Sequence, residues 1–259
     1  MSEGLLKDYS RQAETYDATR GASPSILRPL EEALAGAPGR RLLDVGGGTG
    51  NYARALRDAG WDVLVLDRSP PMLARAAAKG LETREADAQS LPVDDESADA
   101  VVMVSMLHHV DDPARALAEV RRVLRPGGRL ALMVYAREDI AAQWYHDYFP
   151  STRAWMDASH PTLPELTAEL PGARRLPVVF TDLEDASLGA LSAFPERVLE
   201  PQWRRQTSYF ERLERDHPEE MRDGLERLRS ELAQGRGPTS AGGGSVLAWE
   251  KPVAGSAAG

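Results

Sequence analysis

Short apolar runs alternate with longer amphipathic segments along the first half of the chain. Five apolar runs predict β-strands, at residues 41–45, 61–66, 81–86, 98–107 and 129–135. Three intervening segments have apolar residues at helical spacing and end near Gly or Pro, which predicts α-helices at residues 51–59, 71–79 and 113–124. Residues 98–107 are almost continuously apolar, as expected for a strand covered on both faces. The alternation predicts an open, mostly parallel sheet with right-handed crossovers.

Further elements extend this core at both ends. We expect helices at residues 3–20 and 24–34, and beyond residue 136 an aromatic-rich segment at 140–160, a helix at 162–170, two or three helices within 187–234 and a turn at 242–244. Strands at residues 176–180 and 245–250 would complete a seven-stranded sheet. We therefore predict one α/β domain over residues 1–259, divided into N-terminal helices (1–36), a core (41–136), a mainly helical segment (137–242) and the last strand (245–250).

The most informative segment follows the first predicted strand and reads Asp44-Val-Gly46-Gly-Gly48-Thr-Gly50. Glycines permit positive φ and let a ligand approach the backbone without meeting a Cβ. The start of the next helix adds free N–H groups and the positive end of a dipole. A dinucleotide fingerprint would require glycine at residue 51, or glycine or alanine at residue 53, and the chain has Asn51 and Ala53. A nicotinamide site is therefore only weakly supported, although it is not excluded.

Four more segments accompany this turn in a fixed order. Asp67 ends the second strand, Asp87-Ala88 follows the third, residues 105–113 (SMLHHVDDP) follow the fourth, and residues 124–129 (LRPGGR) precede the fifth. Together with residues 15–20 (TYDATR), they resemble the motifs of class I S-adenosylmethionine-dependent methyltransferases. The chain most resembles the ubiquinone/menaquinone-type small-molecule methyltransferases, and the resemblance covers residues 9–136. It implies a Rossmann-like, mostly parallel seven-stranded sheet flanked by helices. Residues 1–36 would then be lid helices, residues 41–136 the cofactor-binding core, and residues 137–242 a helical substrate cap.

The resemblance also implies a role for each matching residue. Gly46, Gly48 and Gly50 would approach the methionine part of the cofactor, and Asp44 would lie near its ammonium group or orient the turn. Asp67 would accept the ribose hydroxyls, because a carboxylate accepts hydrogen bonds on two oxygens. The remaining expected cofactor contacts are Tyr16, Arg20, Arg68, Met72, Asp87, Ala88 and Ser105, with Arg68 and Met72 on the adenine faces and Asp87-Ala88 at the adenine edge.

Methyl transfer from a sulfonium depends largely on positioning, and it needs a base only if the acceptor must lose a proton. His108 and His109 are the candidate bases, although both could instead shape the pocket, and we expect that neighbouring side chains cannot both face it. His146 and His160 are further candidates, and His217 is expected to be solvated. The acceptor pocket is predicted to include Tyr9, His108, Trp144, Tyr145 and Tyr148. The alternative for this aromatic segment is that it attaches a cap to the sheet.

Composition narrows the classes of function. The 259 residues contain no cysteine, which excludes a disulfide framework, a Cys-ligated metal and a thiolate nucleophile, and we predict no metal site. The net charge of −9 does not favour a nucleic-acid partner. We expect a cytoplasmic monomer or homodimer without a membrane span, acting on a small molecule. The alternatives are an RNA or protein methyltransferase, a non-methylating S-adenosylmethionine-binding enzyme and a nicotinamide dehydrogenase.

Overall fold

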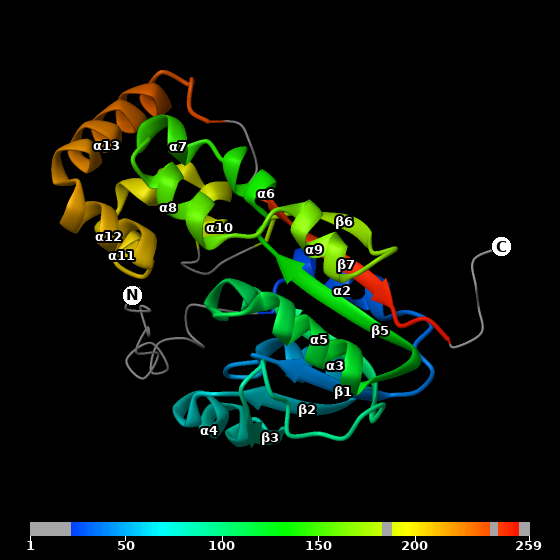
Figure 1. Cartoon of the computed structure of the whole chain (residues 1–259). Helices are drawn as coiled ribbons and strands as arrows, with labels where there is room; N and C mark the ends of the chain where they lie inside the picture. The colour runs from blue at the N-terminus through cyan, green and yellow to red at the C-terminus, as the bar shows by residue number, and fades with distance from the viewer. Residues whose placement is uncertain (1–21, 183–187, 239–242, 254–259) are drawn as a thin grey trace.

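The computed structural model describes residues 22–182, 188–238 and 243–253 and contains a seven-stranded sheet (Figure 1). The strand order is β3-β2-β1-β4-β5-β7-β6. The strands are β1 (Arg41–Val45), β2 (Asp62–Asp67), β3 (Glu82–Glu85), β4 (Ala98–Val104), β5 (Leu124–Val134), β6 (Arg174–Val179) and β7 (Gly243–Glu250). Strands β1 to β5 pair in parallel, and β7 is antiparallel to both β5 and β6. The predicted fold class, an α/β fold with a mostly parallel seven-stranded sheet, is confirmed.

The helices begin where the sequence provides a proline or a capping side chain. Pro24 and Pro113 occupy first-turn positions, where a missing N–H costs nothing. Asp112 caps one helix by accepting from the Arg115 N–H at 3.0 Å. The α-helices are α2 (Pro24–Leu34), α3 (Asn51–Asp58), α4 (Pro70–Ala78), α5 (Pro113–Val123), α6 (Arg137–Ala141), α7 (Tyr145–Tyr148), α8 (Thr152–Ser159), α9 (Leu163–Glu169), α10 (Leu188–Ala193), α11 (Pro201–Arg204), α12 (Ser208–Asp216) and α13 (Pro218–Ala233). Two 3-10 helices are η1 (Leu107–His109) and η2 (Pro195–Leu199).

The sheet separates two apolar cores, because successive residues of a strand point to opposite faces. Val65 and Val102 face the core that α2, α3 and α4 cover. Leu66 and Met103 face the core that α5 and α9 cover. Almost all of β4 is buried, as its continuous apolar run predicts. The parallel strands are therefore held from both sides, which fixes the positions of the loops that follow their carboxyl ends.

A third apolar core lies beyond the sheet, in a group of helices that we call the cap (α7, α8, α10, η2, α11, α12 and α13). Figure 1 shows these helices gathered at one end of the sheet, on the side toward which the arrow of β5 points. Their shared core consists of Trp144, Tyr145, Tyr148, Phe149, Leu191, Val198, Tyr209, Phe210, Leu213, Met221 and Leu228. Apolar residues of the helices within 187–234 thus pack inside this cap. Pro195, Pro201 and Pro218 each begin a new segment, so the described part of 187–234 has more helices than the sequence predicts.

Three predicted boundaries are wrong for local reasons. The strand predicted to end at residue 107 ends at Val104, because the chain turns into η1. The predicted turn at residues 124–129 lies inside β5, where the pairing register with β4 shifts. Gly243 and Gly244 pair with β6 as part of β7 instead of forming a turn. The predicted helix at 3–20, with Tyr9, Tyr16 and Arg20, lies outside the described residues.

Candidate functional site

The turn after β1 holds glycines in conformations that other residues rarely adopt. Gly46 and Gly48 have φ of +71° and +56°. A Cβ on Gly46 would come within 2.8 Å of the Met106 side chain. A Cβ on Gly48 would meet nothing within 4 Å and would extend into open space. Gly46 is thus required for local packing and backbone conformation. Gly48 instead leaves space in which a ligand could approach the backbone.

Asp67, at the end of β2, holds this turn in place. Its Oδ2 accepts from the Gly48 N–H at 2.9 Å, and its Oδ1 accepts from the Ser69 N–H at 2.8 Å. Burial raises the pKa of Asp67, and these backbone N–H groups work in the opposite direction. Each carboxylate oxygen still has acceptor capacity, because an ionised oxygen can accept more than one hydrogen bond.

Asp44, the last but one residue of β1, is 2% exposed and lies beneath the turn. Its Oδ2 has no hydrogen-bond partner among the described residues. Burial, with a smaller contribution from the charge of Asp67, raises the pKa of Asp44 to about 7. A Cβ on Gly47 would lie 2.6 Å from the Asp44 carboxylate, so this glycine is also restricted. The motif pattern, which relies on alternate glycines, did not reveal that requirement.

Asp87 and Ala88 lie in the loop after β3. Asp87 is exposed, and its Oδ1 accepts from the backbone N–H of Gln89 at 2.8 Å. Gln89 is itself fixed, because its side-chain oxygen accepts from the Asp112 N–H and its carbonyl accepts from Arg115, both at 3.0 Å. The expected adenine-edge motif is therefore part of an ordered turn, although Asp87 itself is solvent-accessible.

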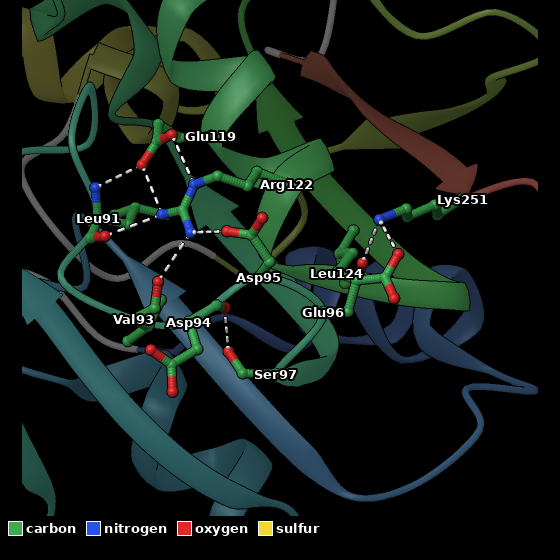
Figure 2. Close-up of polar contacts among 10 residues, drawn as sticks. All are labelled: Leu91, Val93, Asp94, Asp95, Glu96, Ser97, Glu119, Arg122, Leu124 and Lys251. Atoms are coloured by element: carbon green, nitrogen blue, oxygen red, sulfur yellow. Dashed lines mark hydrogen bonds and ion pairs between the residues drawn. The ribbon is translucent and has the colours of Figure 1, made fainter.

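The continuation of this loop is clamped by Arg122 of α5 (Figure 2). The Arg122 guanidinium donates to the carbonyl oxygens of Leu91 and Val93, each at 2.9 Å. It also pairs with Glu119 at 2.8 Å, and Glu119 accepts from the Leu91 N–H at 2.7 Å. The Arg122 hydrogen bond lowers the pKa of Glu119, so this clamp stays charged at neutral pH.

One cavity of about 770 Å³ connects these strand ends with the cap. Its wall on the sheet side includes Asp44, Gly46, Gly48, Asp67, Arg68, Met72, Asp87, Ala88, Ser105, His108 and His109. All described residues predicted to bind the cofactor therefore line one cavity, except Gly50. Gly50 precedes α3 with φ of +76°, and a Cβ there would clash with Leu81. Its role in this structure is backbone conformation and packing.

The two neighbouring histidines both line the cavity. The expectation that they cannot both face it is wrong, because they belong to η1, where consecutive residues are a third of a turn apart. The ring centroids of His108 and His109 are 3.9 Å apart. His160 from the end of α8 stacks on His108 at 5.2 Å and also lines the cavity. The structure thus gathers three imidazoles at this wall.

Backbone strain marks the same place. Ser105 directly follows β4 and has φ of +52°, which is unusual for a residue with a Cβ. Its N–H donates to the Met133 carbonyl at 3.0 Å, so pairing with β5 holds the strained conformation. Strained positions of this kind cluster at binding and catalytic sites.

His146 is not part of this cavity wall. It is 2% exposed, its Nδ1 lies 3.1 Å from Thr152 Oγ1, and it is absent from the lining residues. Burial lowers the pKa of His146 to about 4. His146 is therefore a buried, neutral packing residue of the cap interior and not a candidate base.

The aromatic segment divides between the cavity and the cap interior. Tyr145 lines the cavity as predicted. Trp144 and Tyr148 do not, because their polar groups bond to other parts of the cap. Trp144 donates through Nε1 to the Ser192 carbonyl at 2.8 Å, and the Tyr148 hydroxyl donates to Glu231. The aromatic segment therefore does both things that the sequence left open: it lines part of the cavity, and it packs within the cap.

Several lining residues were not identified from the sequence. Tyr135 directly follows β5, and its place after a parallel strand was a usable signal. A polar face of α12 and the residues before it also reach the cavity. We expected part of residues 187–215 to roof the acceptor pocket, but not which side chains would do so. The missed lining residues include Gln89, Met106, Tyr135, Phe180, Gln206, Ser208, Glu211, Arg212 and Arg215.

Known proteins similar to this chain share the part that builds the cavity's sheet side. Residues 43–132 match a family described as a methyltransferase domain. An uncharacterized methyltransferase of Mycobacterium tuberculosis is 45% identical over 118 residues, covering 45% of this chain and 48% of the relative. Demethylmenaquinone methyltransferase of Renibacterium salmoninarum is 37% identical over 131 residues, covering 48% of this chain and 55% of the relative. The chain thus spans about half the length of these curated relatives.

Similarity in fold extends further than similarity in sequence. The solved structure of a proposed methyltransferase from an antibiotic biosynthesis pathway of Anabaena variabilis has a TM-score of 0.67, covering 87% of this chain and 98% of its own. The two are 23% identical, so this likeness shows the fold. None of the described helices is long and apolar enough to cross a membrane. The resemblance seen in the motifs is confirmed to this extent: residues 43–132 match the methyltransferase domain family, and the chain shares the fold of a solved methyltransferase structure.

Proposed function

We propose that this chain transfers a methyl group from S-adenosylmethionine to a small, largely apolar or aromatic metabolite. The observation that carries the proposal is the single cavity that joins the glycine turn and Asp67 to the aromatic wall of the cap. A donor and an acceptor bound at its two ends would share one space. A shared space of this kind favours an in-line transfer, because it can hold the reacting atoms in position.

The residues at the sheet end fit the cofactor in shape and charge. The open space in front of Gly48 admits a ligand close to the backbone. The unpartnered carboxylate oxygen of Asp44 lies beneath this turn and suits the neighbourhood of an ammonium group. Asp67 would accept the ribose hydroxyls, with Met72 and the Asp87–Ala88 turn at the adenine. These assignments follow the expected motif roles and remain part of the proposal.

When bound, S-adenosylmethionine supplies an electrophilic methyl group on a positively charged sulfur. The chain's own contribution is then to orient the acceptor, exclude water and remove a proton where the acceptor has one. His108, His109 and His160 line the cavity and are the groups able to take that proton. Burial lowers the pKa of His160, so this imidazole is neutral and able to accept a proton at neutral pH.

The cap favours a small-molecule acceptor over RNA or protein. Its rings pack mainly into a core of their own, and Tyr145 and Tyr209 of that core also line the cavity. The net charge of −9 also opposes a polyanionic substrate. The cytoplasmic location and the monomer or homodimer state stay predictions.

Calorimetric titration tests the cofactor, and a labelled-methyl screen of cell extract tests the transfer. We expect S-adenosylmethionine and S-adenosylhomocysteine to bind with one-to-one stoichiometry, and labelled product to appear together with S-adenosylhomocysteine. Binding without any labelled product or accumulation of S-adenosylhomocysteine would favour a non-methylating enzyme. Absence of binding would contradict the proposal.

A further inference from the structure

Tyr145 has a fixed position at the acceptor side of the cavity. Its side chain is 2% exposed and lines the cavity. Three neighbouring rings hold it, with centroids at 4.6 Å for His146, 5.1 Å for Tyr209 and 6.1 Å for Trp144. The contacts with Tyr209 and Trp144 are edge-on, which is a favourable arrangement of aromatic rings. The ring of Tyr145 therefore cannot turn freely, and its hydroxyl has a defined place.

The hydroxyl of Tyr145 differs from the other polar groups of this aromatic cluster. Tyr209 donates to Thr152 at 2.7 Å, Tyr148 donates to Glu231, and the Trp144 indole donates to a backbone carbonyl. The Tyr145 hydroxyl makes no hydrogen bond to any of the described residues. Burial raises the pKa of Tyr145, so the group remains a protonated donor. Because Tyr145 lines the cavity, a bound ligand can accept a hydrogen bond from this hydroxyl.

The charges around the cavity indicate what kind of ligand group would accept this bond. Its lining carboxylates are Asp44, Asp67 and Asp87, which lie at or after the ends of β1 to β3, and Glu211, which is exposed on α12. Within the described part of the chain, the cap therefore offers no buried carboxylate to pair with a protonated amine. An uncharged acceptor avoids the cost of burying a charge that has no partner.

The third component is a neutral imidazole. The Nδ1 of His160 lies 3.0 Å from the Met156 carbonyl, and a carbonyl only accepts, so Nδ1 carries the hydrogen. In a neutral ring Nε2 is then the basic nitrogen. His160 stacks on His108, and both line the same cavity as Tyr145. A donor hydroxyl and a basic imidazole that line one cavity form a suitable pair for an acidic hydroxyl.

Given the proposed methyl transfer, on which this inference rests, we infer that the acceptor is a planar ring with an acidic hydroxyl, a phenol or an enol, whose oxygen accepts from Tyr145. The hydroxyl proton passes to an imidazole nitrogen. An oxygen lone pair forms the new bond to the methyl carbon as the carbon–sulfur bond breaks and its electron pair returns to sulfur. The products are a methyl ether and a neutral thioether, and the imidazolium releases its proton to solvent. Tyr145 acts as the specificity residue by holding the oxygen as its negative charge develops.

Paired probes test this assignment on the full chain saturated with S-adenosylhomocysteine. The probes are para-nitrophenol, whose anion is yellow, and its methyl ether para-nitroanisole, with naphthol and its methyl ether as a second pair. The variant is Tyr145→Phe, which removes only the hydroxyl. The matched control is Tyr148→Phe, which removes a hydroxyl from the same aromatic cluster but outside the cavity. Calorimetry gives the affinities, and absorbance reports the bound phenolate.

We expect the wild type and Tyr148→Phe to bind each hydroxyl probe at least about tenfold more tightly than its ether, with a yellow bound state for para-nitrophenol. In Tyr145→Phe this preference should fall by at least about tenfold, while affinity for the ethers is unchanged. Equal binding of hydroxyl and ether, no binding of either hydroxyl probe, or a preference that survives in Tyr145→Phe would overturn the inference. S-adenosylhomocysteine affinity is measured in the same samples. Its absence would overturn the proposed function as well, whereas its presence without discrimination would overturn the substrate class alone.

Discussion

The carboxylate of Asp67 accepts a hydrogen bond from the backbone N–H of Gly48 at 2.9 Å. This bond joins the end of β2 to the turn that follows β1, two segments 19 residues apart in the chain. The same carboxylate is the group expected to receive the ribose hydroxyls. One side chain would thus shape the turn and contact the ligand, so a substitution there affects both.

Replacing Asp67 with alanine should weaken S-adenosylmethionine binding by at least about tenfold, because hydrogen bonds to a charged group contribute roughly 1.5–3 kcal/mol each. Asp67→Asn keeps one acceptor oxygen and should lose less affinity. Calorimetry measures the affinity, and circular dichroism checks that the fold is retained. Wild-type affinity in Asp67→Ala would show that this carboxylate does not contact the cofactor.

Substitutions at two neighbouring glycines of the turn should have different effects, one on cofactor binding and the other on stability. Gly48→Val places its side chain into open cavity space, so we expect cofactor binding to be abolished with a folded α/β protein. Gly47→Val would push a side chain against Asp44 and Val65, where a Cβ already comes within 2.9 Å, so we expect a large loss of stability. Thermal unfolding and calorimetry separate the two effects. If Gly48→Val still binds the cofactor, the turn is not the site.

The stability of the free protein should depend on pH through Asp44. Its pKa is about 7 in the folded state and 3.8 in the reference state, so the folded protein binds this proton more tightly. The stabilising contribution is complete below the lower value and is lost as the pH rises through the higher one. The wild type should therefore lose up to roughly 4 kcal/mol relative to Asp44→Asn across this window.

The measurement for Asp44 is urea unfolding of both proteins from about pH 4 to pH 8, with the difference plotted against pH. The comparison cancels the titration of all other groups that the substitution leaves unchanged. A difference that is flat across this range would mean that the Asp44 carboxylate is not held in a raised state.

Replacing one glycine of the cap with alanine should destabilise the protein, although this change usually stabilises a helix. Gly224 is buried in α13, and a Cβ there would lie 2.6 Å from the Tyr148 carbonyl oxygen and would clash with the Phe149 ring. Gly224→Ala should therefore lower the unfolding free energy by about 1–3 kcal/mol, despite alanine's higher helix propensity. Ser230→Ala, at an exposed position of the same helix, is the control and should be neutral or mildly stabilising. Calorimetric melting of both variants decides whether the packing at Gly224 is as tight as described.

The parts of the fold that could be predicted are those set by local patterns. The strands β1, β2 and β4 are apolar runs between polar turns, and the glycine turn follows from the residues alone. Asp67 and Asp87 were placed correctly at the cavity because the carboxyl ends of parallel strands meet at one edge of a sheet.

The errors arise where tertiary packing decides the direction of a side chain. His108 and His109 face the same cavity because the chain leaves β4 in a 3-10 turn. This turn is only three residues long, which is too short to show a periodic pattern in the sequence. Both tyrosines of the short helix α7 belong to the cap core, but only Tyr145 also lines the cavity. The contacts that separate them come from α12 and α13, far along the sequence.

Hydrogen exchange on the free protein and on its complex with S-adenosylhomocysteine tests most directly the claim that the strand ends form one cofactor site. The structure predicts simultaneous protection of three segments that are distant in sequence: the turn at residues 46–50, the segment at 67–72 and the loop at 86–89. The outer helix α13 should be unchanged, because none of its residues lines the cavity. Protection of all three segments at a common ligand concentration would support the account. Exchange at the glycine turn that does not respond to saturating ligand would contradict it.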